Sequence, residues 1–495
     1  MDFKSKFQSF IHSLPGLGLC TKEATIDDIK YQRMKSQESK KIEYHPRVVT
    51  IDDILDEIGL GFFHVKLFLL LGSLFFLVSL EISVLSFISP LLKLEWNLSV
   101  WHEALLPLVT TCGMTVGASF WGWVSDRYGR KPALVGSTSF ILCFGFASSF
   151  ALNYYWISVF LFFTGIGLAL ETQVITMIEE FFPKENRTKF SLAACVFWTL
   201  GFLISALVRT QESFVGFRGL LFLVCIPAAM FLTGTTLVPE SPRFCLASGD
   251  GEKALQILQR TAPANKSAMF RKWQLYQNVH DTNSTRGNVV ELFRHGYAMI
   301  TSLLWLIWFF SFLSYYFTVF SVTEIAMTNN VLKFEHAHAN HVDHDIDNSH
   351  YSTLAWMTIP EIFLILSTTL ASHYIEDKTL ILLYTLVAVI LQSVVLIVGF
   401  KYETTVLVLI ILTRGILLCQ GTLIFIYTTE VYPTTTRGIG MGTAYSMSRI
   451  GMIAGPFVAQ TLSHFHGIIL NIVSLVLALL TAVALPRHKL DQMLE

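Results

Sequence analysis

Long apolar segments alternate with short polar ones along most of this chain. Between residues 65 and 486, runs of about twenty mostly apolar residues recur, each ended by charged or turn-forming residues. A helix that crosses the hydrocarbon core of a bilayer needs about 20 such residues, so each run predicts one membrane span. The runs lie near residues 65–90, 103–124, 132–151, 154–178, 190–208, 218–238, 298–322, 351–371, 379–400, 404–427, 438–462 and 466–486. This pattern predicts an all-α integral membrane protein with twelve transmembrane helices.

The polar segments divide the chain. Before the first span, Thr50 and Asp53 have the spacing of a capping box, and apolar residues follow at helical intervals as far as Ile58. The longest polar interruption falls between the sixth and seventh spans. We therefore expect an N-terminal tail with a short amphipathic helix (1–64), a six-helix bundle (65–238), a central loop (239–297), a second six-helix bundle (298–486) and a C-terminal tail (487–495).

Composition and loop charge set the environment and the orientation. The chain is 53% hydrophobic and 14% charged, whereas a soluble protein has about 25% charged residues. Its net charge of −1 gives no reason to expect nucleic acid as a partner. Loop Lys and Arg concentrate in 125–131, 183–189 and 240–297, which places these loops, the central loop and both tails in the cytosol. In this orientation the sequon at Asn97 lies on the non-cytosolic side, where it can be glycosylated. We expect the protein to reside in the plasma membrane or in the membrane of an intracellular vesicle.

The two halves share a motif. Glu180-Phe-Phe-Pro183-x3-Arg187 follows the fourth span, and Glu430-Val-Tyr-Pro433-x3-Arg437 follows the tenth, about 250 residues later. The segment 373–378 occupies the place equivalent to the loop 126–131. The aspartate, the glycine and the arginines of the first loop have no equivalent there, and only Lys131 is matched, by Lys378. Two pseudo-symmetric bundles around a central cavity are typical of a secondary transporter.

The loop between the second and third spans resembles a known signature. Its GxxSDRxGRK pattern (Gly122, Ser125, Asp126, Arg127, Gly129, Arg130, Lys131) is similar to the signature loop of the major facilitator superfamily. The segments TIDDILDEIG, WLIWFFSFLSYYF and TTEVYPTTTRGIGMGT resemble the branch related to synaptic vesicle protein two, close to the organic cation and anion carriers. The resemblance covers nearly the whole chain from Thr50 onward.

This resemblance implies alternating access, in which one bundle rocks against the other. The signature loop would act as a latch, with Asp126 facing the N-terminus of span eleven and Arg130 paired with Glu179 or Glu180. The implied latch residues are Gly122, Asp126, Arg127, Arg130, Lys131, Glu179, Glu180, Glu430 and Arg437. Leu161 stands where relatives carry an arginine, and the latch of the second half is degenerate. Both departures argue against simple proton coupling.

Away from their ends, the predicted spans contain five charged residues, and charge at such depth is costly. Glu81 could bind a cation or carry a proton, or form a structural ion pair. Arg449 could bind an anionic substrate group, or be held by Glu361 or Glu81. Arg414 suits a structural pair. Glu171 could pair with Arg414 or Arg449, and Glu361 has no favoured role.

Aromatic and histidine clusters leave alternatives open. Trp305, Trp308, Tyr315 and Tyr316 could stack on a flat substrate or form an aromatic belt; Tyr315 and Tyr316 suit the cavity, and Trp305 suits the belt. The histidines of loop 336–350 could bind zinc, respond to pH, or belong to a solvated loop, and we assign no metal site.

No nucleotide-binding or catalytic motif is present: GxxxxGK[ST], HExxH, GxSxG and Cys-x2-Cys are all absent. We therefore predict a monomeric membrane transporter, not an enzyme, that works without a cofactor and moves a small organic ion by alternating access. The alternative is a transporter-like binding or regulatory protein of a vesicle membrane without net flux.

Overall fold

The computed structural model describes residues 48–209, 217–262, 274–275, 288–294, 296–335, 359–399, 403–461 and 464–486. Most of both predicted tails and the histidine-rich loop 336–350 lie outside these residues. The chain separates into two units, Met1–Val48 with Lys272–Gln274 and all remaining residues. Only Val48 and Gln274 of the first unit are described, and all the described helices belong to the second. The strands β1 (Val48–Val49) and β2 (Gln274–Leu275) form a two-stranded sheet.

The first half begins with the predicted amphipathic helix. In α3 (Ile51–Ile58) the Thr50 side chain accepts a hydrogen bond from the Asp53 backbone, the reverse bond is also present, and Gly59 ends the helix. The capping box is therefore confirmed. The following helices are α4 (Phe62–Trp96), α5 (Val100–Tyr128), α6 (Arg130–Ser149), α7 (Tyr154–Leu168), α8 (Glu171–Phe181), η1 (Lys184–Asn186), α9 (Arg187–Arg209), α10 (Phe217–Gly234) and η3 (Thr235–Leu237).

The second half follows a short connecting region. That region contains α11 (Pro242–Ala247), α12 (Gly251–Thr261) and η6 (Val289–Phe293). The long helices are then α14 (Tyr297–Glu335), the helix Ile359–Ala371, α16 (Asp377–Val398), α17 (Glu403–Val431), α18 (Arg437–Thr461) and α19 (His464–Ala484).

The fourth predicted span is interrupted. Helix α7 ends at Leu168, and the N–H of Gln173 then donates to the Leu170 carbonyl three residues back, a tighter turn than that of an α-helix. Helix α8 begins again at Glu171. This carboxylate therefore lies in the first turn of a helix, where the helix dipole favours negative charge.

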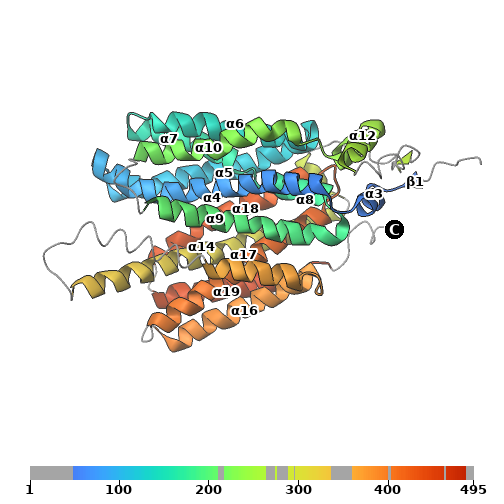
Figure 1. The fold of residues 1–495 in the computed structure, drawn as a ribbon. Coiled ribbons are helices and arrows are strands. Elements are labelled where there is room, and N and C mark those ends of the chain that lie inside the picture. The colour runs from blue at the N-terminus through green and yellow to red at the C-terminus, as the bar shows by residue number, and fades with distance from the viewer. Residues whose placement is uncertain are drawn as a thin grey trace, which may run out of the picture. The chain divides into compact units, whose positions relative to one another are not determined.

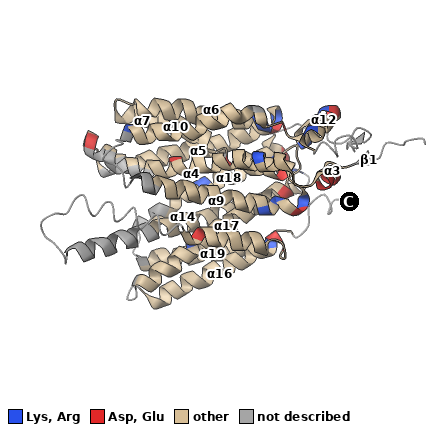
Figure 2. Cartoon of the chain, in the orientation of Figure 1, with Lys and Arg blue, Asp and Glu red and all other residues tan. Residues whose placement is uncertain are grey.

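Among the described residues, nine segments are long and apolar enough to cross a membrane, with α7 and α8 forming one of them. Arg218–Gly234 and Ile359–Ala371 are shorter apolar helices. The glycine-rich helix α18 completes the predicted twelve. In Figure 2, charged residues gather at the end of the helices near α3 and α12, and few lie along the middle of the helices. The predicted all-α membrane fold is confirmed.

Packing within each half follows the same scheme (Figure 1). In the first half α4 packs against α9 and α10, and α6 packs against α7 and α10. In the second half α14 packs against α18 and α19, and α16 packs against α17 and α19. Each of these contacts of the first half thus recurs between the helices that come six spans later. The helices that meet across the halves include α5 with α18, and α9 with α17.

Candidate functional site

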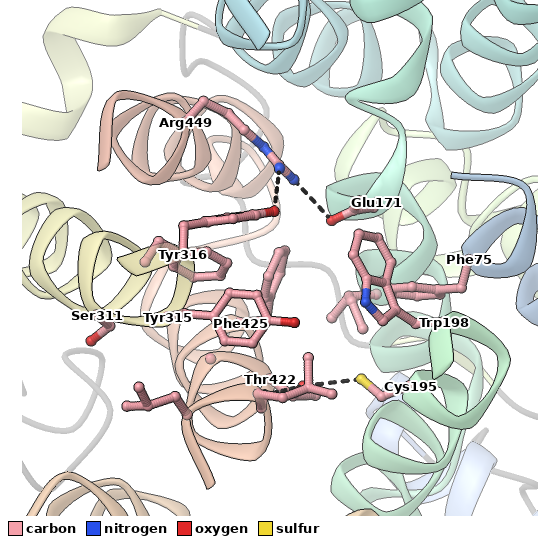
Figure 3. Close-up of a pocket in the computed structure, with 15 residues that line it drawn as sticks. Phe75, Glu171, Cys195, Trp198, Ser311, Tyr315, Tyr316, Thr422, Phe425 and Arg449 are labelled. Carbon is pink, nitrogen blue, oxygen red and sulfur yellow. Dashed lines mark hydrogen bonds and ion pairs between the residues drawn. The ribbon is translucent and has the colours of Figure 1, made fainter. Parts of the chain in front are cut away.

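A cavity lies where the two halves face each other (Figure 3). Helices α4, α8 and α9 contribute one wall, and α14, α17 and α18 contribute the other. The empty space between its lining residues, including the part that is open to solvent, is about 580 Å³. Its lining includes six aromatic residues: Phe75, Trp198, Phe312, Tyr315, Tyr316 and Phe425.

One side of the cavity is charged. The Arg449 guanidinium of α18 lies 3.2 Å from the Glu171 carboxylate of α8, so this ion pair joins the two halves. Tyr445 donates its hydroxyl hydrogen to the same Glu171 oxygen at 2.6 Å. Arg449 also donates to the Tyr316 hydroxyl at 3.3 Å, and its guanidinium carbon lies 4.2 Å from the centre of the Tyr445 ring. Cys195 and Thr422, 3.0 Å apart, also line the cavity (Figure 3).

The structure places the other charged residues of the spans elsewhere. Arg414 and Glu361 form their own ion pair at 2.6 Å within the second half, and neither lines the cavity. Glu81 is buried in α4, near Cys225 of α10 and outside the cavity lining. The expectation that Glu361 or Glu81 holds Arg449 is wrong, because Glu171 occupies that position. Of the two partners considered for Glu171, Arg449 is the one observed.

The aromatic residues of α14 separate along the helix. Tyr315 and Tyr316 line the cavity, as their position suggested. Trp308 does not, since it is fully buried and donates its indole hydrogen to Thr428 at 3.0 Å. Trp305 packs against Phe293 near the start of the helix. Asn97 is exposed in the turn between α4 and α5.

A second charged cluster, the inner latch, joins α5 to α18. It consists of Asp126, Arg130, Glu180 and Arg437. Asp126 accepts hydrogen bonds from the backbone N–H groups of Gly438 and Ile439 at 2.9 and 2.8 Å. A carboxylate at this position pairs the free N–H groups of the α18 N-terminus and opposes its partial positive charge.

Arg130 holds the centre of the latch. It is fully buried and contacts Glu180 at 3.1 Å and Asp126 at 3.0 Å. It also donates to the backbone carbonyl groups of Ser125 and Thr434. Glu180 in turn lies 3.1 Å from Arg437, so the cluster connects the two halves through both carboxylates.

Close backbone contact supports the latch. A Cβ atom on Gly122 would overlap the carbonyl oxygen of Gly438, and a Cβ on Gly438 would overlap that of Gly122. Only glycine at both positions allows α5 and α18 to approach this closely.

The remaining predicted latch residues take other positions. Glu179 accepts a hydrogen bond from Ser191 at 2.9 Å, and Glu180 rather than Glu179 is the partner of Arg130. Arg127 is exposed, 5.8 Å from the Trp123 ring. Lys131 directs its backbone N–H to Glu240 at 3.4 Å. Glu430 lies in the last turn of α17.

The sequence repeat has a structural counterpart. Arg187 donates from Nε to the carbonyl of Phe182, and Arg437 donates from Nε to that of Tyr432, each five residues back. The pairs differ, however: Arg437 reaches Glu180 in the other half, whereas Arg187 contacts Asp52 of its own half. Asp377, the first residue of α16, stands where Arg130 begins α6, and it accepts a hydrogen bond from Thr188.

Two carboxylates of this region were not anticipated. Glu240 accepts N–H bonds from Arg130 and Ser241 at 2.8 and 2.9 Å, and so caps α6. Burial raises the pKa of Glu240, whereas these N–H groups lower it. Glu240 lies in the segment Pro-Glu-Ser-Pro-Arg (239–243), which directly follows the sixth span.

The other unanticipated carboxylate is Asp52 of α3, which contacts both Arg187 and Arg243. Burial lowers the pKa of Arg243 to about 10, the charge of Arg187 acts in the same direction, and Asp52 opposes both. Asp52 therefore offsets the repulsion between two neighbouring arginines. No distinctive sequence spacing marks this contact.

Comparison with known proteins agrees with this geometry. The family model described as Major Facilitator Superfamily matches residues 71–456. The chain is 32% identical to "Putative transporter svop-1" of Caenorhabditis elegans (84% of this chain, 80% of that protein). It is 31% identical to "Synaptic vesicle 2-related protein" of Xenopus laevis (83% and 75%). It is 28% identical to "Putative transporter SVOPL" of Homo sapiens (84% and 86%).

Among solved structures, the fold is similar to that of the proton:xylose symporter XylE. The XylE structure with bound 6-bromo-6-deoxy-D-glucose gives a TM-score of 0.69 at 16% identity, covering 88% of this chain and 99% of the symporter. The inward-open conformation of XylE from E. coli gives 0.58 at 15% identity, covering 85% and 95%. These likenesses concern the fold.

Proposed function

The chain belongs to the major facilitator superfamily of multi-pass membrane transporters, and on that premise we propose that it carries a small organic ion by alternating access. The observation that carries the proposal is the cavity between the two halves. Its ion pair has one partner in each half, Glu171 and Arg449. A ligand bound there would contact both halves, and its binding would depend on how they are placed.

The inner latch supports the same mechanism. Its hydrogen bonds cross between the halves at Asp126 and at Glu180. With the latch formed, the path from the cavity to the cytosol is closed. We propose that opening of the latch converts this state into one that faces the cytosol, with both chain termini on that side. The relatives named for synaptic vesicles favour a vesicle membrane over the plasma membrane.

The second candidate is a binding or regulatory protein of a vesicle membrane that does not cycle. The observation in its favour is Asp377, an acidic residue at the position that Arg130 holds in the first half. The second half therefore lacks an arginine-centred latch at this position, and the conformational equilibrium is asymmetric.

Uptake by reconstituted protein separates the two candidates. A first screen would record the melting temperature of purified protein with organic cations, organic anions, sugars and nucleotides, because a bound ligand stabilises the fold. Ligands that shift the melting temperature would then be tested for uptake into sealed liposomes. Saturable uptake supports the carrier, and binding without uptake supports the regulatory protein.

We predict that Asp126→Asn slows transport at least about tenfold, while ligand affinity changes less than twofold. The amide keeps one acceptor but turns its NH₂ group toward a backbone N–H of α18, so one charge-assisted bond is lost, a loss of about 1.5–3 kcal/mol. Because Asp126 does not line the cavity, binding should persist. Uptake and thermal-shift titration on the same preparation measure both quantities. Transport at the wild-type rate would contradict the latch assignment.

A further inference from the structure

The ion pair in the cavity leaves hydrogen-bonding capacity unused. The Glu171 Oε2 atom accepts from both Tyr445 and Arg449, whereas its Oε1 atom has no partner among the described residues. Arg449 donates from its two terminal nitrogens, and its Nε atom likewise has none. Both side chains are almost completely buried. Burying such atoms without partners costs free energy, so a ligand that pairs them is favoured.

A third unused group lies on the same wall as Glu171, across the cavity from Arg449. The indole nitrogen of Trp198 is buried and has no partner within the described part of the chain. Trp198 extends into the cavity from α9, on the same side as Glu171 (Figure 3). The cavity therefore offers one free acceptor on a carboxylate and two free donors, one on a guanidinium and one on an indole.

The charges of the site restrict what can satisfy these atoms. A simple cation would pair with Glu171 but draw it away from Arg449, leaving a buried positive charge without its partner. A simple anion would pair with Arg449 and draw it away from Glu171, leaving a buried negative charge without its partner. A ligand with one positive and one negative group compensates both side chains and adds no net charge to a buried site.

The spacing of the pair limits the ligand further. Glu171 and Arg449 are only 3.2 Å apart, so groups that pair with both must also lie close together. An ammonium and a carboxylate on one carbon atom meet this condition. The remaining space lies between Phe75 and Trp198 on one wall and Tyr315 and Phe425 on the other. Flat faces of this kind suit an aromatic ring.

We propose that the cavity binds an aromatic zwitterion of the amino-acid type, with its ammonium on Glu171, its carboxylate on Arg449 and Trp198, and its ring between the aromatic walls. This inference rests on the proposed function, because it takes the cavity to be the substrate site. It deepens that proposal by naming the class of organic ion.

Three matched indoles test the proposal on purified full-length protein. Tryptophan carries both charged groups, tryptamine lacks the carboxylate, and indole-3-propionate lacks the ammonium. Titration of each against the melting temperature gives its dissociation constant. We expect tryptophan to bind at least about tenfold more tightly than either of the other two, because each of them forgoes one charge-assisted interaction.

Substitutions should change the ranking in opposite directions. Glu171→Gln leaves the charge of Arg449 uncompensated, so indole-3-propionate should bind at least as tightly as tryptophan. Arg449→Gln leaves the charge of Glu171 uncompensated and should favour tryptamine in the same way. The control is Glu361→Gln, which removes a carboxylate from the other buried pair without altering the cavity lining. Its ranking should match the wild type.

The outcomes separate this inference from the proposed function. If either analogue binds as tightly as tryptophan, or if none of the three binds, the zwitterion site is refuted. Uptake of any other organic ion would still support the proposed carrier function. If tryptophan binds as expected but no ligand is taken up, the zwitterion site is supported and the proposed carrier function is refuted. Should a variant not fold, the wild-type ranking alone decides the question.

Discussion

Replacement of Arg130 by methionine is expected to lower the free energy of unfolding by about 3 kcal/mol, toward the lower end of the 3–5 kcal/mol found when one partner of a buried ion pair is removed. Arg130 is buried between Asp126 and Glu180 and pairs two backbone carbonyl groups as well. Methionine fills similar volume but pairs none of these four acceptors. The lower end applies because Asp126 and Glu180 keep other partners.

Arg127→Met is the matched control for this substitution. Arg127 belongs to the same loop and has the same charge, but it is exposed. Its loss should change stability by no more than about 0.5 kcal/mol. Arg130→Lys should fall between the two, because lysine keeps the charge and loses the forked geometry. Melting temperatures of the purified variants provide the comparison. An equal fall in melting temperature for Arg127→Met and Arg130→Met would refute the central role of Arg130 in the inner latch.

The second large effect is expected from Gly438→Ala, which should favour opening toward the cytosol. The added methyl group overlaps the Gly122 carbonyl and the Asp126 carboxylate, so α5 and α18 must separate at the latch. Overpacking of this kind costs about 1–3 kcal/mol, which corresponds to roughly a 5- to 150-fold change in the equilibrium between the two states.

The reactivity of Cys195 reports this opening. Cys195 lines the cavity and is buried, so in a protein with no other cysteine its reaction with a membrane-impermeant thiol reagent measures access. In sealed inside-out vesicles, Gly438→Ala should react at least about fivefold faster than the parent protein. Gly145→Ala is the control, because its Cβ would have only the native Cys225 sulfur nearby, at an ordinary 3.8 Å, and replacing Cys225 by alanine in the parent protein removes that atom. Unchanged or slower reaction in Gly438→Ala would mean that these glycines do not set the closed state.

Apolar runs and the repeated motif predicted most of the fold. The twelve spans follow from hydropathy alone, because the bilayer imposes their length. The repeated motif predicted that the segments after spans four and ten are equivalent. In both, the arginine of the motif donates a hydrogen bond to the carbonyl group five residues earlier. Local chemistry of this kind depends on neighbouring residues and can be read from the sequence.

Partner choice among buried charges could not be read in this way. From the sequence, Glu171 had two possible arginine partners, Arg414 and Arg449, and the structural alternative for Arg449 named Glu361 or Glu81 instead of Glu171. The observed pairs, Arg449 with Glu171 and Arg414 with Glu361, depend on which helix faces which across the interface. The interruption between α7 and α8 also sets the position of Glu171. Neither property has a local periodic signal.

Asp52 and Glu240 were missed for a related reason. Both lie in polar segments where acidic residues are common, and their importance comes from the helix ends that they reach. Glu240 lies 110 positions after Arg130, and Asp52 lies 135 positions before Arg187. An acidic residue in a polar segment gives no sign of such distant partners.

The different partners of the two repeated arginines bear on inhibitor design. Arg437 binds across to the opposite half, whereas Arg187 turns back to helix α3 of its own half. The Arg437 bridge therefore favours the inner-closed arrangement, whereas the repeat-related Arg187 makes its ion pair within its own half. We expect unliganded protein to rest with its pocket toward the vesicle lumen or the cell exterior. A polar inhibitor aimed at this pocket should consequently act from that side of the membrane and have little effect when it is supplied only to the cytosol.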